Sequence, residues 1–315
     1  MTKKPKYILR MPSTRFFYRE GRRTEGYSFF DWVHGYIYSR WPYFYIGVAT
    51  GEHRLSRFLS GFWERIAGFF SRSSDGNSGS ATDTFAHGYH GKVVPLEEAC
   101  ELVSIEQEVS LKDLEQIIPY DRARDIIMKN PDHIVVLDCP CRASRPEPCL
   151  PLDVCLIIGE PFAGFVAEHH PRRSRWITRD EAVEILRAEH GRGHVHHAFF
   201  KDAMLGRFYA ICNCCSCCCG AMQSWENGVP MLASSGYVSR IQSEDCIGCG
   251  TCAEFCQFKA LKPENGHMTV EENRCMGCGV CVSKCANGAI KLERDESRGE
   301  PLRIRQLIEK SAERS

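Results

Sequence analysis

The chain has 315 residues, of which 43% are hydrophobic and 25% are charged, a composition typical of a globular protein with two or three domains. Its 40 Lys/Arg residues balance 40 Asp/Glu residues, so the net charge does not favour nucleic acid as a partner. The 19 cysteines would indicate disulfides in a secreted protein, but residues 1–30 lack the uninterrupted apolar segment of a signal peptide.

Residues 1–72 form a basic, aromatic segment that differs from the rest of the chain. They contain 13 Lys/Arg against 5 Asp/Glu and more than half of the aromatic residues. Apolar residues recur at helical spacing over 55–69. An earlier helix is expected to begin after Ser28, a good N-cap with Asp31 three residues on, and to end before Pro42.

Three roles for these helices are open. A helix with aromatic residues on one face and arginines on the other suits peripheral membrane association, here through residues 28–70. The same surface could dock on a redox protein partner, or pack on the protein's own core. Neither helix is expected to span a bilayer, because charged residues and Pro42 interrupt the apolar stretch. Residues 73–90, rich in Ser, Gly and Asp, are predicted to be a flexible linker.

Residues 91–236 are predicted to be a mixed α/β domain. The expected elements are a helix with a break at Pro119, two buried strands, and a helix that Thr178 and Glu181 would cap. They cover, in order, 110–130, 133–138, 154–158 and 178–189.

Ten cysteines of this domain occur in two groups. The first group is Cys139, Cys141, Cys149 and Cys155. The second is Cys212, Cys214, Cys215, Cys217, Cys218 and Cys219. Six cysteines in eight residues are too dense for ordinary core packing, so we predict an additional metal centre. The first group is our preferred ligand set, and the second would form another site or share the first. The alternatives are an iron–sulfur cluster, zinc, or thiols alone.

Histidines are also concentrated in this domain. His194 and His197 would share one face of a helix, where they could bind a metal or act in acid–base chemistry. The alternative is a polar loop, because Gly191 and Gly193 interrupt regular structure.

The most specific pattern is a repeated cysteine run, C-x2-C-x2-C-x3-C. The first copy is Cys246, Cys249, Cys252 and Cys256, and the second is Cys275, Cys278, Cys281 and Cys285. This is the ligand pattern of two [4Fe–4S] clusters, in which the fourth cysteine of each run binds the other cluster. The expected ligand sets are Cys246, Cys249, Cys252 with Cys285, and Cys275, Cys278, Cys281 with Cys256. Zinc is the alternative metal.

Residues 241–292 therefore resemble the bacterial two-cluster ferredoxins. The resemblance implies a ferredoxin-like fold and one-electron transfer. The family usually has proline after each fourth cysteine, whereas this chain has Gln257 and Ala286. The cysteines of 131–219, followed by this repeat, also resemble a module of uncharacterised ferredoxin-fused iron–sulfur proteins from strict anaerobes, which implies a redox role.

We accordingly expect an α+β protein with a helical N-terminal segment (1–72), a linker (73–90), a cysteine-rich α/β domain (91–236), a ferredoxin domain (237–292) and a charged tail (293–315). The expected function is electron transfer with a redox partner, in the cytoplasm or at the inner face of the membrane of an oxygen-avoiding cell. A reductase with its active site in the cysteine-rich domain, or a redox or metal sensor, is the alternative. No dinucleotide fingerprint, phosphate loop or nucleophile elbow is present.

Overall fold

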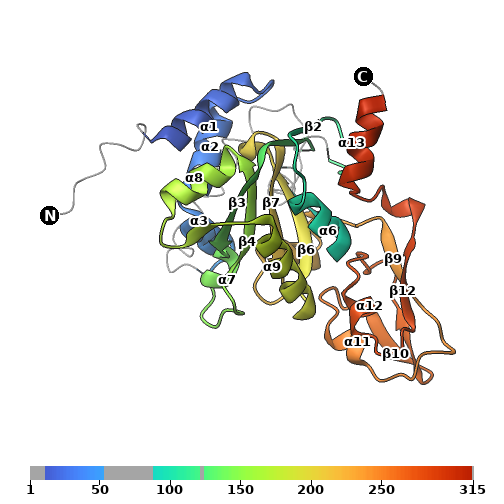
Figure 1. The fold of residues 1–315 in the computed structure, drawn as a ribbon. Coiled ribbons are helices and arrows are strands. Elements are labelled where there is room, and N and C mark those ends of the chain that lie inside the picture. The colour runs from blue at the N-terminus through green and yellow to red at the C-terminus, as the bar shows by residue number, and fades with distance from the viewer. Residues whose placement is uncertain (1–10, 53–87, 121–123, 314–315) are drawn as a thin grey trace, which may run out of the picture.

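A mixed sheet of eight strands forms the centre of the protein (Figure 1). The computed structural model describes residues 11–52, 88–120 and 124–313. The strand order is β2-β3-β4-β7-β6-β1-β8, with β5 paired to β3. The strands are β1 (Tyr89–Val94), β2 (Val109–Leu111), β3 (Ile126–Asp138), β4 (Asp153–Glu160), β5 (Ser174–Ile177), β6 (Val195–Lys201), β7 (Arg207–Cys214) and β8 (Leu232–Ala233). The pairing is antiparallel, except between β1 and β8.

Helices cover both faces of this sheet. One face carries α1 (Pro12–Arg23), α2 (Phe29–Arg40), α3 (Pro42–Ala49) and α8 (Phe162–His169). The other carries α6 (Leu96–Val103), α9 (Arg179–Gly191) and α13 (Ile304–Glu313). Successive residues of a strand point to opposite faces. Cys155 therefore belongs to the core under α2 and α8, whereas its neighbour Leu156 belongs to the core under α9.

Short elements connect these layers. They are α7 (Pro140–Ala143), η3 (Asp202–Met204), α10 (Gly220–Glu226) and η4 (Glu296–Arg298). The helix α7 directly follows β3, and α10 follows the cysteine-rich turn after β7.

The repeated cysteine runs lie in a small unit beside the sheet domain (Figure 1). The strands β9 (Tyr237–Ile241) and β12 (Ile290–Arg294) pair with each other, as do β10 (Leu261–Glu264) and β11 (His267–Val270). Two short helices, α11 (Thr251–Glu254) and α12 (Val280–Lys284), follow equivalent positions of the two runs. The mixed helix and sheet content agrees with the expected α+β class.

Local sequence signals correctly predicted the positions of several helices and strands. The Ser28 and Asp31 side chains each accept a hydrogen bond from the other's backbone N–H, at 3.1 and 2.8 Å, which confirms the cap of α2. The Thr178 hydroxyl accepts from the backbone N–H of Glu181 and starts α9. The strands expected over 133–138 and 154–158 lie within β3 and β4.

Two expectations were wrong. The described residues of 110–130 do not form the expected helix, because β2 pairs with the start of β3 and buries Val109, Leu111 and Ile126 across that pairing. Neither a helix nor a polar loop contains His197. It lies on β6, a strand whose residues are all buried between β1 and β7.

The described N-terminal helices pack on the α/β domain. Phe17 of α1 is 1% exposed, and its ring meets those of Phe162 and Phe165 at 6.0 and 5.9 Å. The buried carboxylate of Glu20 forms an ion pair of 2.7 Å with Lys129 of β3. The helix expected over 55–69 and the linker up to residue 87 lie outside the described residues.

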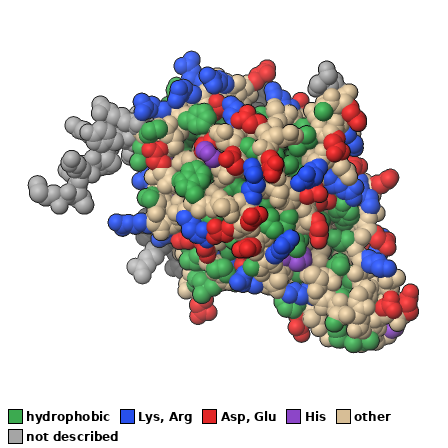
Figure 2. Space-filling view, in the orientation of Figure 1, with side chains coloured by type: hydrophobic (Ala, Val, Ile, Leu, Met, Phe, Trp, Pro, Cys, Tyr) green, Lys and Arg blue, Asp and Glu red, His purple; other side chains and the backbone are tan. Residues whose placement is uncertain are grey.

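The outer surface of this helical layer is basic and partly aromatic. Figure 2 shows Lys and Arg side chains gathered over the end of the molecule that α1 forms, where Arg15, Arg19, Arg22 and Arg23 are exposed. Phe29 is 60% exposed. Within the described ranges, no helix is long and apolar enough to cross a membrane. Membrane association through residues 28–70 stays a prediction.

The packing of α1 gives a stability prediction. Phe17→Ala should lower the free energy of unfolding by about 3–5 kcal/mol, because it leaves a cavity between α1 and α8. Phe29→Ala is the matched control on the neighbouring helix and should cost about 1 kcal/mol or less. Thermal unfolding of the two variants measures the difference, and equal shifts would show that α1 does not depend on Phe17 for its packing.

Candidate metal centres

Each cysteine run forms a tight loop that leads into a short helix. Gly248 and Gly277 have φ values of 66°, a conformation that strains other residues. A Cβ atom on Gly277 would lie 2.2 Å from the carbonyl oxygen of Tyr237, and one on Gly248 would lie 2.3 Å from that of Gly266. These loops therefore need glycine for conformation and for room.

Four cysteines meet at the outer end of this unit, and we call Cys246, Cys249, Cys252 and Cys285 the peripheral quartet. Burial raises the pKa of Cys252, and the nearby thiols of Cys285, Cys246 and Cys249 raise it further. Cys249 is exposed, and the adjacent Ile247 is 71% exposed. The peripheral quartet is thus open to solvent on one side.

The other four cysteines, Cys256, Cys275, Cys278 and Cys281, form the inner quartet. Burial raises the pKa of Cys278 well above its usual value, followed by the neighbouring thiols of Cys281, Cys256 and Cys275. Cys256 and Cys278 pack against the core that also contains α2 and α8. The structure thus brings together the two cysteine sets expected from the sequence.

Several hydrogen bonds point at these sulfur atoms. The backbone N–H of Met268 donates to Cys246 Sγ at 3.4 Å, and that of Ala260 donates to Cys256 Sγ at 3.3 Å. The Ser239 hydroxyl lies 3.1 Å from Cys281 Sγ. Such bonds stabilise thiolates and help to set cluster potentials, so the chemistry of these thiols fits cluster ligands.

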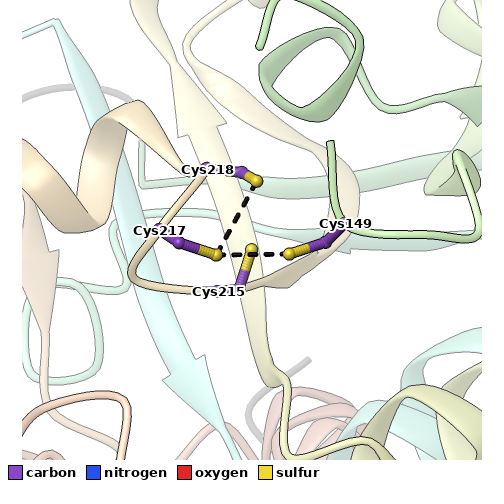
Figure 3. Close-up of side chains that lie close together, drawn as sticks. All are labelled: Cys149, Cys215, Cys217 and Cys218. Atoms are coloured by element: carbon purple, nitrogen blue, oxygen red, sulfur yellow. Dashed lines mark hydrogen bonds between the residues drawn. The ribbon is translucent and has the colours of Figure 1, made fainter. Parts of the chain in front are cut away.

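A third set of four cysteines, the loop quartet, is Cys149, Cys215, Cys217 and Cys218 (Figure 3). Their Sγ atoms all lie within 4.8 Å of one another. The Sγ atom of Cys217 is 3.2 Å from that of Cys149 and 3.7 Å from that of Cys218. Four sulfurs around one tetrahedral ion, at bond lengths of about 2.3 Å, would be about 3.8 Å apart. The loop quartet therefore has the spacing of a single-ion site.

This compact spacing distinguishes the loop quartet from the other cysteines. Among the residues that the structure describes, no second group of three or more Cys, His, Asp or Glu side chains is close enough to share one ion. The thiols of the peripheral and inner quartets are farther apart, so neither quartet has the spacing of a single-ion site.

Six of the seven remaining cysteines of the α/β domain form a row of buried and half-buried thiols, which we call the buried row. Neighbouring thiols act on one another electrostatically in the order Cys212, Cys155, Cys139, Cys141, Cys219 and Cys214. The ligand set preferred from the sequence is thus divided between two places. Cys139, Cys141 and Cys155 belong to the buried row, whereas Cys149 lies on the loop before β4 and reaches Cys217.

A buried arginine connects the two cysteine groups. Arg142 is 1% exposed, and its Nη2 donates to the carboxylate of Glu189 at 2.6 Å and to the carbonyl oxygen of Asn213 at 2.9 Å. Burial lowers the pKa of Arg142, but the charges of Glu189, Cys139 and Cys215 outweigh that effect and raise it. The guanidinium thus stays charged beside thiols of both groups.

A cavity of about 130 Å³ lies between the buried row and the helices α2 and α3. Besides these thiols it is lined by Tyr38, Tyr89, Tyr209 and Lys201. The hydroxyls of Tyr38 and Tyr209 are 2.8 Å apart, and the Lys201 ammonium lies 4.7 Å from the centre of the Tyr89 ring. Burial lowers the pKa of Lys201 to about 8.

The sequence analysis did not predict the arginine, lysine and tyrosines that line this cavity. Arg142 directly follows the Cys-Pro-Cys triplet, and Lys201 ends an apolar strand, so both were unusual charges in buried segments. The tyrosines carried no such signal, because Tyr38 is far from Tyr209 in the chain and only the fold brings them together.

Residues 239–292 match the family model described as a 4Fe-4S dicluster domain. A search of curated proteins found no match to the chain. The family match, together with the thiol clusters, supports an iron–sulfur protein with at least one [4Fe–4S] cluster.

The glycine geometry gives a prediction for the inner quartet. Gly277→Ala should reduce the iron bound by the ferredoxin domain by about half, because the added Cβ would collide with the Tyr237 carbonyl and displace the loop of one of the two clusters that the sequence predicts. Gly288→Ala is the matched control, since Gly288 has the same φ of 66° but no atom within 4 Å of its Cβ position. Iron and sulfide analysis measures both, and equal losses would contradict the steric explanation.

Proposed function

We propose that this protein transfers electrons between a ferredoxin domain with two [4Fe–4S] clusters and a metal centre in its cysteine-rich α/β domain. The observation that carries the proposal is the position of the inner quartet, which packs into the α/β core while the peripheral quartet stays at the surface. When bound, each cluster supplies a site that gains or loses one electron.

Gln257 anchors the ferredoxin domain to the cysteine-rich turn. Its side-chain carbonyl accepts from the backbone N–H and the hydroxyl of Ser216 at 2.8 and 2.9 Å. Its amide donates to the carbonyl oxygen of Gly193 at 3.1 Å. Ser216 lies between Cys215 and Cys217 of the loop quartet. The residue that replaces the usual proline thus fixes the inner quartet's loop to the α/β domain.

An aromatic contact lies beside this anchor. Phe258 is 1% exposed, and its ring meets Trp225 at 5.1 Å and His197 at 6.5 Å. His197 is opposite Cys212 in the pairing of β6 with β7, so the two side chains share a face of the sheet. Phe258 is two residues after Cys256 of the inner quartet, and it contacts His197 beside Cys212 of the buried row. These contacts therefore connect the inner quartet with the buried row.

The exposed side of the peripheral quartet is where a redox partner would meet the protein. Ile247 and Cys249 offer an apolar, exposed contact next to cluster ligands. A protein partner that exchanges electrons here would not need to reach the α/β domain.

A reductase is the second candidate function. The cavity beside the buried row is lined by Tyr38, Tyr209 and Lys201, which are groups that donate protons. A small substrate reduced there would take electrons from the ferredoxin domain and protons from these side chains. This candidate differs from the first in requiring turnover of a substrate.

Counting electrons tests the proposed function. Stepwise reduction of the anaerobically purified protein with reduced methyl viologen should deliver at least about three electrons per chain, because the two ferredoxin clusters take only about two. An uptake limited to about two electrons would contradict the proposed function, because no centre of the α/β domain would then accept electrons from this reductant.

The Gln257 anchor gives a prediction for the rate. Gln257→Pro restores the usual ferredoxin residue but removes three hydrogen bonds, each worth about 1 kcal/mol, so the contact should weaken by about 3 kcal/mol. Freeze-quench EPR after mixing with the reductant should then show slower electron arrival in the α/β domain at unchanged iron content. Ala286→Pro is the matched control in the other run, where Ala286 is exposed. Equal rates for the two variants would exclude Gln257 from the route.

A further inference from the structure

We infer that the buried row binds an iron–sulfur cluster of its own, separate from a single-ion site at the loop quartet. The inference goes beyond the proposed function, because the row would bind this cluster whether or not electrons reach it from the ferredoxin domain.

The fold directs all six thiols of the row to one place. Cys155 lies directly opposite Cys212 in the pairing of β4 with β7, and Cys212 and Cys214 are two residues apart on β7, so they share a face. Cys139 lies between the end of β3 and the start of α7, and Cys219 is the residue before α10. Four chain segments thus converge on the same side of the sheet.

The number and spread of these thiols do not suit one ion. A tetrahedral ion binds four thiolates, whereas the row has six and none of its groups is as compact as the loop quartet. The thiols instead follow one another along a cavity of about 130 Å³. A water molecule occupies about 30 Å³ in the liquid, so this cavity has room for several inorganic atoms. Iron and sulfide between the thiols would fill it.

Packing or disulfide formation explains the row less well. All 19 cysteines lie in the described residues and none forms a disulfide. Thiols that served only as small apolar side chains would be expected to close the space rather than line a cavity.

The charges around the cavity suit an anionic centre. Arg142 and Lys201 are 1% and 2% exposed, and both line the cavity. Buried cations are costly unless a compensating charge lies near. Glu189 pairs with Arg142, and Asp202 acts on Lys201. The charges of Cys139 and Cys215 also act on Arg142. Thiolates bound to iron would supply further negative charge near both cations.

The decisive measurement is iron, zinc and acid-labile sulfide per chain in the anaerobically purified, full-length protein. The wild type should hold iron and sulfide beyond the roughly eight of each that the ferredoxin domain takes. Cys155→Ser with Cys212→Ser should remove this excess iron and sulfide and leave the ion of the loop quartet in place. Cys149→Ser with Cys217→Ser should remove one ion and no sulfide, because a single-ion site contains none.

Two outcomes would overturn the inference. One is a row variant that keeps the sulfide content of the wild type, and the other is a loop variant that loses sulfide. An unchanged EPR signal of the ferredoxin clusters shows that a variant is folded. If the excess sulfide is present but the protein takes up only about two electrons, the proposed function fails and the inference stands.

A measurement on the wild type tests the same inference without depending on whether the variants fold. A chelator should remove the ion of the loop quartet first, because Cys217 is exposed, and the sulfide-bearing iron of the row later, because Cys139, Cys155, Cys214 and Cys219 are buried. Release of all metal from the α/β domain in one phase would contradict two separate centres.

Discussion

The pairing of β4 with β7 is the constraint on which the cysteine-rich domain depends. It sets Cys155 opposite Cys212, and it fixes the direction in which the turn after β7 leaves the sheet. That turn carries Cys215, Cys217 and Cys218 to the loop quartet, in which Cys217 is exposed. It carries Cys219 to the buried row, which lies under α2 and α3. A shift of one residue in the register of this pairing would turn Cys212 to the other face of the sheet, so Cys212 would no longer belong to the buried row.

The same turn is where the ferredoxin domain is attached. Ser216, between two cysteines of the loop quartet, receives the Gln257 side chain, and Phe258 packs under Trp225 and His197. The ferredoxin domain therefore presents its inner quartet, and not its peripheral quartet, to the thiols of the α/β domain. The helices α1 to α3 close the opposite side, where the rings of α1 pack on α8. The result is a thiol-lined cavity between the sheet and the helices α2 and α3.

Local signals made part of this arrangement predictable. The ferredoxin loops follow from spacing within each run, and the caps at Ser28 and Thr178 follow from residues three apart. The division of the cysteines between the loop quartet and the buried row could not be predicted in this way, because it depends on contacts between distant segments. Cys149 meets Cys217 across 68 positions, and the neighbours Cys218 and Cys219 belong to different groups. Residues 110–130 were mistaken for a helix because their pairing with each other outweighs helical spacing.

We propose that the ferredoxin domain faces a metal centre held by the α/β domain. Anomalous X-ray scattering at the iron absorption edge, from crystals grown without oxygen, would locate every iron atom. We expect iron at the peripheral and inner quartets and further iron beside Cys139, Cys155 and Cys212. Iron confined to the two ferredoxin quartets would show that the α/β domain holds no iron centre.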